Sequence, residues 1–404
     1  MPCQGPDNHA ATQWTIRIIP FFIFGAFGYA KYVVIARLCV DYLYRQERQH
    51  GTAIALIILY FVFFFLTLAA YLRTFITANR NPGLVPFNDR RKAVDDQRKT
   101  LPKRERERIE SQPEWLPSDQ DPDSPGLEEF YTKEVFVCEQ DGRPRWCSLC
   151  WHWKPDRAHH SSDLRRCVRK MDHLCPWVGG MVSETSMNFF VQFTFYCTLF
   201  LAVCIGTGGY CLWKQLRDHR ALDARIVVLL ALAGFFVIFT LGMTLSSGKL
   251  IFDNITSVDV LNKSRQYHLA VRVPLDSPST TEYWTITYPL LRPAGLTQGA
   301  DGQPLAPRDA RARRTFAILR TRPGENPWDL GAWRNFKSVM GNSVLEWLLP
   351  IRHSPCCNHE SAESEYEFGP VIQDLRKRFK TPEFEEGLPV MTGIEMQETT
   401  RMGS

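Results

Sequence analysis

The chain has 404 residues, a formal net charge of +5, and a composition in which 45% of residues are hydrophobic and 23% are charged. Its length is enough for about two or three ordinary domains. The mean hydropathy of −0.22 is that of a soluble protein. The apolar residues are nevertheless concentrated in a few long runs, which exclude an ordinary soluble chain.

Four long apolar stretches predict membrane-spanning helices. Three contain uncharged runs of about 20 residues, the length that crosses a hydrocarbon core. The first carries Lys31 and Arg37 and has a soluble core helix as its alternative; we favour a span because long basic side chains near a helix end can reach the membrane interface. It is also too long for a removed signal peptide and lacks the small-residue cleavage site. The predicted helices are 15–40, 52–73, 188–213 and 225–248.

The remaining segments are assigned from their composition. A basic run at 87–110 is either a solvated face or attracts an anionic lipid or ligand. The predicted fold class is an all-α polytopic membrane protein with a small cysteine-rich domain between its second and third helices. Its other predicted parts are an N-terminal tail (1–14), a basic and acidic linker (74–137), the cysteine-rich domain (138–187), a C-terminal domain (249–357) and a disordered acidic tail (358–404).

Cysteine usage predicts the orientation in the membrane. A C-x2-C pair between the second and third helices favours the reducing side, where thiols stay free for metal binding or catalysis. Charge is a weaker guide, because the positive-inside rule applies poorly to long loops. We therefore expect the cysteine-rich domain, the linker, the C-terminal region and both termini to be cytosolic. A glycan on Asn254 or Asn262, which lie in sequons, would contradict this topology.

The cysteine-rich segment has the spacing of a zinc site. Cys147 and Cys150 form a C-x2-C pair, and the adjacent His159 and His160 precede Cys167. Three thiolates and one imidazole complete a tetrahedral zinc site. The alternatives are a redox pair or buried thiols, but no thioredoxin-like pattern surrounds the pair. Spacing alone does not decide which of the two histidines is the ligand.

The sequence MDHLCPW follows at 171–177 and suggests a nucleophile. The thiolate of Cys175 is the reactive form, His173 can act as its base, and Asp172 can fix the tautomer of that histidine. The pattern is short and common by itself. Its place beside a zinc site and at a membrane face suits an acyl thioester whose fatty chain lies in the membrane.

These residues resemble the DHHC palmitoyltransferases, integral-membrane S-acyltransferases with a cysteine-rich domain between the second and third of four helices. The segment WCSLCWHWKPDRAHHSSDLRRC at 146–167, followed by MDHLCPW, is similar to the family pattern without a gap. The resemblance covers roughly 81–259 and again 326–351. Its variant pattern, with Val-Gly-Gly-Met after Pro-Trp, resembles a fungal branch of the family.

The resemblance implies one zinc ion where the family has two. The four positions of the second family site carry no metal-ligating side chain, and we expect their apolar members to pack together instead. The ligands implied for the first ion are Cys147, Cys150, His160 and Cys167. The positions of the lost second site are Ser161, Leu164, Leu174 and Met181.

The resemblance also implies a reaction. The family takes palmitate from palmitoyl-CoA onto the motif cysteine and passes it to a cysteine of a protein substrate. Carried over, Cys175 is the nucleophile, His173 the base and Asp172 its orienting group, held near Ser257.

Cations are needed for the phosphates of CoA, and exposed charges without a ligand are the alternative for each candidate. We expect Trp177 to pack at the membrane interface rather than contact the acyl chain. The candidate cations are Lys154 and Arg157, with Arg169 and Lys170 nearby.

Two other classes remain as alternatives. A catalytically silent zinc-stabilised scaffold is the second interpretation, and a membrane-anchored RING-type ubiquitin ligase is disfavoured because it needs eight ligands for two ions. Expected partners are cytosolic or membrane-associated proteins with acceptor cysteines, not nucleic acid, and the expected location is an endomembrane or the plasma membrane. Cys356 and Cys357 are either acylated themselves or idle surface thiols.

Overall fold

The computed structural model describes residues 6–87, 89–102, 104–105, 108–109, 124, 126–261, 266–288, 313–356 and 366–383. By its contacts the chain divides into two compact units, each described here by itself. The first contains 1–119, 145–266 and 322–372, and the second contains 120–144, 267–321 and 373–404. Asn262 and Cys357 lie outside the described residues.

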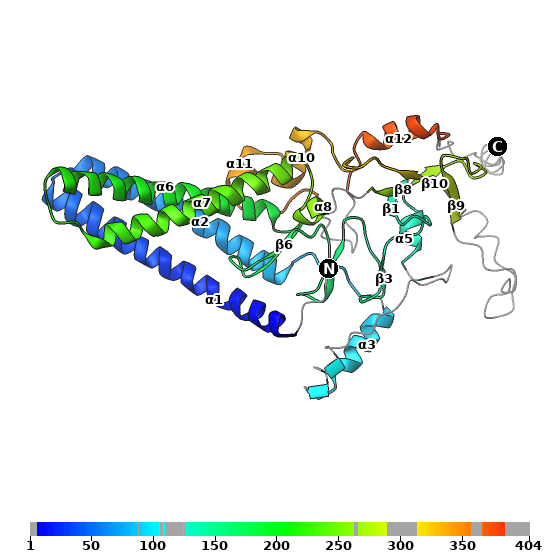
Figure 1. Ribbon diagram of the computed structural model, residues 1–404, viewed down its shortest axis with the longest axis horizontal. Helices are drawn as coiled ribbons and strands as arrows, with labels where there is room; N and C mark the ends of the chain where they lie inside the picture. Colours follow the sequence, from blue (N-terminus) through cyan, green and yellow to red (C-terminus); the bar gives the residue numbers. More distant parts are fainter. Residues whose placement is uncertain are drawn as a thin grey trace, which may run out of the picture. The chain divides into compact units, whose positions relative to one another are not determined.

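Among the described residues, four helical stretches are long and apolar enough to cross a membrane. The first stretch begins at residue 18 and continues from an α-helix into a π-helix. Figure 1 shows the third and fourth stretches running side by side, and the third packs against both the second and the fourth. The helices are α1 (Pro6–Lys31), the π-helix η1 (Tyr32–Gln46), α2 (His50–Arg80), α6 (Met187–Arg217) and α7 (Ala224–Phe252).

The centre of this helical bundle is aromatic. Tyr60 of α2 is fully buried, and its ring lies 5.1 Å from that of Phe200 of α6. In the most apolar 18-residue part of α6, 56% of the residues are buried. The corresponding part of each of the other three stretches is 22% buried. The helix α6 is therefore the central one, and the others leave most of their apolar surface on the outside, as expected for helices in contact with lipid.

Three short β-hairpins form the cysteine-rich segment between α2 and α6. Their strands are only two or three residues long, so they carry no sequence period that would have predicted them. The chain after α2 is joined to the second hairpin, because Val85 donates to Cys167 O and Arg169 donates to Gly83 O, both at 2.9 Å. The hairpins pair β2 (Trp146–Cys147) with β3 (His152–Trp153), β4 (His159–Ser161) with β5 (Arg166–Val168), and β6 (His173–Cys175) with β7 (Gly180–Val182).

The end of the first unit returns to the membrane helices. Asn335 of α10 donates from its side chain to Phe252 O at 2.8 Å. Further along, the Gln192 amide of α6 donates to Glu346 O at 2.7 Å, and Tyr196 OH donates to Leu348 O at 2.5 Å. The short helices of this unit are α3 (Asp89–Lys99), α8 (Ser257–Leu261), α10 (Ala332–Met340) and α11 (Val344–Leu348).

The second unit contains a four-stranded antiparallel sheet, with strand order β1-β8-β10-β9. Ala270 stands opposite Phe136 on one side and Ile318 on the other. Phe136, Phe316 and Tyr288 are fully buried and in ring contact. The strands are β1 (Val135–Cys138), β8 (His268–Val273), β9 (Trp284–Tyr288) and β10 (Arg314–Arg320); the helices α5 (Glu128–Tyr131) and α12 (Val371–Phe379) complete the described elements.

The predicted all-α class is therefore wrong in part. The apolar helices are present, but the structure also has this sheet and the three hairpins. Its first strand, β1, pairs with β8, which lies more than a hundred residues later in the chain, so this pairing could not be matched from local pattern. The predicted segment boundaries remain predictions.

Candidate functional site

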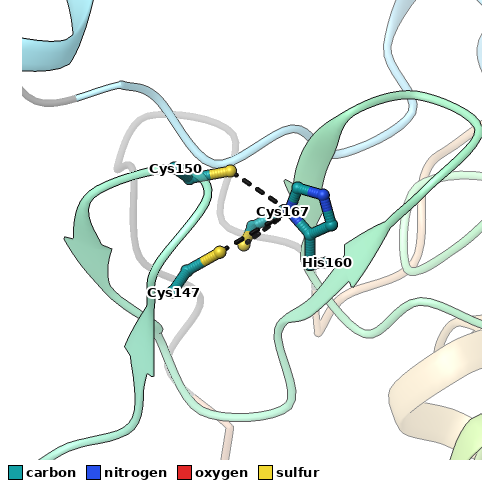
Figure 2. Close-up of side chains that lie close together, drawn as sticks. All are labelled: Cys147, Cys150, His160 and Cys167. Carbon is teal, nitrogen blue, oxygen red and sulfur yellow. Dashed lines mark hydrogen bonds between the residues drawn. The ribbon is translucent and has the colours of Figure 1, made fainter. Parts of the chain in front are cut away.

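Four side chains of the cysteine-rich segment converge on one point, as Figure 2 shows. The ligand atoms of Cys147, Cys150, His160 and Cys167 all lie within 4.8 Å of one another. His160 Nδ1 is 3.5 Å from Cys147 Sγ, 3.3 Å from Cys150 Sγ and 4.0 Å from Cys167 Sγ. A tetrahedral zinc ion with ordinary Zn–S and Zn–N bonds separates such atoms by about 3.6 Å. The donor set and its spacing therefore fit zinc.

The hairpin register explains which histidine joins the cluster. His160 stands directly opposite Cys167 in the β4–β5 pair, while His159 stands opposite Val168. Successive side chains of a strand point to opposite faces, so only His160 shares a face with Cys167. The structure thus separates the two candidates that spacing left open.

The four positions that the family resemblance assigns to a second metal site make other contacts in this structure. Leu174 and Met181 are a cross-strand pair in β6–β7, and Ser161 Oγ accepts a hydrogen bond from Leu164 N at 3.2 Å. Within the described ranges, the cluster above is the single group of His, Cys, Asp or Glu side chains with the geometry for a metal ion.

Asp172 connects the next hairpin with the chain after α7. Its Oδ2 atom is 2.5 Å from His173 Nδ1 and accepts a hydrogen bond from Ser257 Oγ at 3.1 Å. Its Oδ1 atom accepts a hydrogen bond from Ser257 N at 2.8 Å. The carboxylate is buried, at 4% exposure. These contacts leave Nε2, which is also buried, as the ring nitrogen for proton exchange.

The environment of His173 favours the protonated ring. Burial lowers the pKa of His173, but the hydrogen bond and charge of Asp172, together with the neighbouring Cys175 sulfur, outweigh burial and raise that pKa to about 9. An imidazolium beside a thiol stabilises the thiolate, which is the nucleophilic form of cysteine.

The hairpin that carries Cys175 rests on the end of α2. Cys175 stands opposite Gly180 in the β6–β7 pair. A Cβ atom at Gly180 would lie 2.9 Å from Ala78 O, so only glycine permits this approach. The hydrogen bond from Asp172 N to Val182 O, at 3.0 Å, continues the pairing beyond the strand. Contact with a membrane helix thus fixes the position of the cysteine.

An apolar cavity of 680 Å³ lies between α1, α6 and α7, with Cys175 in its wall. Trp177 also lines it and lies against the rings of Phe236 and Phe239, with centroids 5.8 Å and 5.3 Å away. We expected Trp177 to pack at the membrane interface rather than contact an acyl chain, and the structure places its side chain in the wall of this apolar cavity. Its place two residues after the cysteine was the signal available in the sequence.

Arg157 is a structural ion-pair residue in this geometry. Its guanidinium donates to Asn254 Oδ1, Asn254 O and Asp259 Oδ2 at 2.9–3.0 Å, and its side chain is 1% exposed. Burial raises the pKa of Asp259, but Arg157 outweighs it and keeps that pKa below its usual value. The position favours a role in joining segments rather than contact with a phosphate. Asn254, which the sequence offered only as a sequon, is a central residue of this network.

The other predicted cations differ in their surroundings. Lys154 is half-buried. Arg169 is buried and pairs with Glu184 at 3.0 Å. Lys170 is buried and donates to Asn254 Oδ1 at 3.1 Å.

Comparison with known proteins agrees with these features. The family model for the DHHC palmitoyltransferases matches residues 140–264. The chain is 38% identical to palmitoyltransferase pfa5 of Aspergillus fumigatus, over 94% of this chain and 91% of that protein. It is 37% identical to palmitoyltransferase pfa5 of Emericella nidulans, over 89% of this chain and 85% of that protein. It is 31% identical to palmitoyltransferase PFA3 of Saccharomyces cerevisiae, over 56% and 57% of the two chains.

Proposed function

This chain belongs to the DHHC palmitoyltransferase family, and we propose that it is a protein S-palmitoyltransferase that uses Cys175 to carry palmitate from palmitoyl-CoA to protein cysteines. One observation carries the residue assignment. Cys175 lies in the wall of a 680 Å³ apolar cavity and beside a histidine held by a buried carboxylate. The cavity suits a fatty chain, and the histidine suits the proton transfers of thioester chemistry.

In the first step, the Cys175 sulfur attacks the thioester carbonyl of palmitoyl-CoA. The proton of the Cys175 thiol is held by His173 as an imidazolium, which Asp172 stabilises, so the attacking form of Cys175 is the thiolate. Collapse of the tetrahedral intermediate forms the Cys175–acyl bond and breaks the bond to the CoA sulfur. The CoA thiolate takes the proton from His173 and leaves as free CoA.

In the second step, a cysteine thiol of a protein substrate enters in place of CoA. His173 takes its proton, the substrate sulfur attacks the acyl carbonyl, and the Cys175 thiolate is released beside the His173 imidazolium, which restores the starting pair. No oxidant or reductant is needed, because one thioester is exchanged for another. A nucleophile in the wall of an apolar cavity also favours thioesters whose fatty chain can occupy that cavity.

In this proposal the metal cluster has a structural role and takes no part in the acyl transfer. A zinc ion held by Cys147, Cys150, His160 and Cys167 would cross-link the first two hairpins, and the chain after α2 is joined to them by the hydrogen bond from Val85 N to Cys167 O. Structural zinc sites of this kind contribute roughly 10–16 kcal/mol in small peptides. We propose one such ion per chain.

The membrane topology completes the proposal. An even number of spans places both termini and the cysteine-rich segment on one side, and free thiols favour the cytosol. Substrates are then cytosolic or membrane-associated proteins whose cysteines reach the membrane face of an endomembrane or the plasma membrane.

Release of CoA tests the residue assignment. Purified protein in detergent is mixed with palmitoyl-CoA, and free CoA is measured over the first turnover. The wild type should release a burst of about one CoA per chain, as expected for a covalent intermediate. The Cys175→Ser variant should show no burst, and Cys211→Ser, which alters a buried cysteine of α6, should retain it. A full burst from Cys175→Ser would assign the chemistry to another residue, and no burst from the wild type would favour a silent scaffold.

A further inference from the structure

A second cavity, of 450 Å³, lies along α10 and shares no lining residue with the apolar cavity. Its volume is within the range of roughly 300–1,000 Å³ that is typical of ligand sites. Among the described residues that line it, the charged ones are three cations and one carboxylate: Lys170, Arg334, Lys337 and Glu367. This excess of cations indicates an anionic ligand.

One face of α10 supplies much of the cavity wall. Lys337 and Ser338 lie three and four residues after Arg334, which is the spacing of one helix face, and all three line the cavity. Asn335 and Val339, on the other face, are buried. Lys337 Nζ also lies over the Trp333 ring, 5.2 Å from its centroid. Attachment to the core thus fixes the direction in which the two cations are presented.

A buried lysine forms the inner part of the cavity. Lys170 is 7% exposed, and its Nζ atom donates to Asn254 Oδ1 at 3.1 Å. It also lies 5.8 Å from the centroid of the Tyr366 ring and 3.9 Å from Cys356 Sγ. A buried ammonium is costly unless it is well solvated by polar groups, so the residues that hold it form a preorganised cationic site.

The carboxylate stands at the exposed part of the cavity. Glu367 forms an ion pair with Arg334, and the two side chains are 60% and 62% exposed. Exposed ion pairs of this kind are weak. An anion with more charge and more acceptor atoms can therefore replace Glu367, because the planar guanidinium matches phosphate oxygens in pairs.

We propose that this cavity binds the phosphate groups of an organic phosphate, with Glu367 as an internal competitor. Two sources share this chemistry: the phosphorylated nucleotide end of coenzyme A, or the phosphorylated headgroup of an inositol lipid. Only the first source rests on the proposed acyltransfer function. Arg157, which the sequence suggested for phosphate, is engaged with Asp259, whereas Lys170, Arg334 and Lys337 line this cavity.

Cys356 provides a reporter inside the cavity. The full chain, carrying Cys175→Ser and Cys357→Ser to remove competing thiols, is treated with N-ethylmaleimide, and alkylation of Cys356 is followed by peptide mass spectrometry. The probes are desulfo-CoA in detergent, and nanodiscs of phosphatidylcholine with or without phosphatidylinositol 4,5-bisphosphate. We expect at least about fivefold slower alkylation with one probe. Protection by desulfo-CoA identifies the nucleotide end of coenzyme A as the ligand. Protection only by the nanodiscs that contain phosphatidylinositol 4,5-bisphosphate identifies the lipid headgroup as the ligand.

Substitutions separate binding from a structural role. Combined Arg334→Gln and Lys337→Gln should raise the half-protecting concentration by about tenfold or more, whereas Glu367→Gln should lower it by about threefold because the competitor is gone. Arg352→Gln, at an exposed residue that does not line the cavity, is the matched control and should change neither value. Unchanged alkylation with every probe, or weaker binding in Glu367→Gln, overturns the proposal. The CoA burst is measured separately, on the chain with Cys175 intact. A failure of the proposed acyltransfer function can therefore be distinguished from a failure of phosphate binding in this cavity.

Discussion

At residue scale, the contacts of Asp172 make His173 a strong proton acceptor. The carboxylate accepts two hydrogen bonds from Ser257 and contacts the ring through Nδ1. In the proposed mechanism, fixing Nδ1 leaves Nε2 for the reacting thiol, and Asp172 acts by orienting the ring and stabilising its charge.

The pH dependence follows from the raised pKa of His173. That pKa is about 9, so the imidazolium persists at neutral pH and is lost as the pH rises through about 9. Asp172→Asn removes the favourable charge and places an amide N–H against Nδ1, which favours the wrong tautomer. We expect slower acylation of the enzyme, by roughly 10²–10⁴-fold, and an alkaline limit shifted to lower pH. Rates of CoA release from pH 6 to 10, corrected for uncatalysed hydrolysis, check both. An unchanged alkaline limit would contradict the role of Asp172.

At the scale of elements, the close approach of the β6–β7 hairpin, which carries Cys175, to α2 is the contact that leaves least room for a side chain. Gly180→Ala introduces a Cβ atom 2.9 Å from Ala78 O, and the backbone must move to relieve it. We expect a loss of about 1–3 kcal/mol, seen as a lower melting temperature, together with slower acylation. Gly248→Ala, where an added Cβ meets open space, is the control and should preserve both properties. Normal activity in Gly180→Ala would show that the contact does not position Cys175.

The metal cluster belongs to the same scale. Purified protein should contain about one zinc ion per chain by elemental analysis, because the described residues provide one set of ligands. Cys150→Ser should lose that ion and expose the segment to limited proteolysis, while Cys211→Ser should retain it. Two ions per chain would contradict the replacement of the second site.

At the scale of the whole molecule, four apolar stretches predict that both termini lie on the same side of the membrane. Tags placed at the two ends should both be digested by protease added to sealed microsomes. The buried Asn254, at 6% exposure with its amide hydrogen-bonded, should carry no glycan. Protection of either tag would contradict the cytosolic orientation.

Some of this molecule could be predicted from the sequence because the signals are local. Hydropathy over about 20 residues indicates a span, and the spacing of Cys147, Cys150 and Cys167 indicates a metal site. The choice of His160 needed the β4–β5 register. The buried ion pair of Arg157 could not be predicted from the sequence because its partner Asp259 lies 102 residues away, and the pairing of β1 with β8 spans more than a hundred residues.

The central claim is that Cys175 carries the acyl group, and labelling with palmitoyl-CoA tests it most directly. The detergent-purified wild type and Cys175→Ser are incubated with radiolabelled palmitoyl-CoA, then split into samples with and without hydroxylamine, which cleaves thioesters. We predict label on the wild type that hydroxylamine removes, and no such label on Cys175→Ser. Equal hydroxylamine-sensitive labelling of the two proteins would contradict the assignment of Cys175 as the nucleophile.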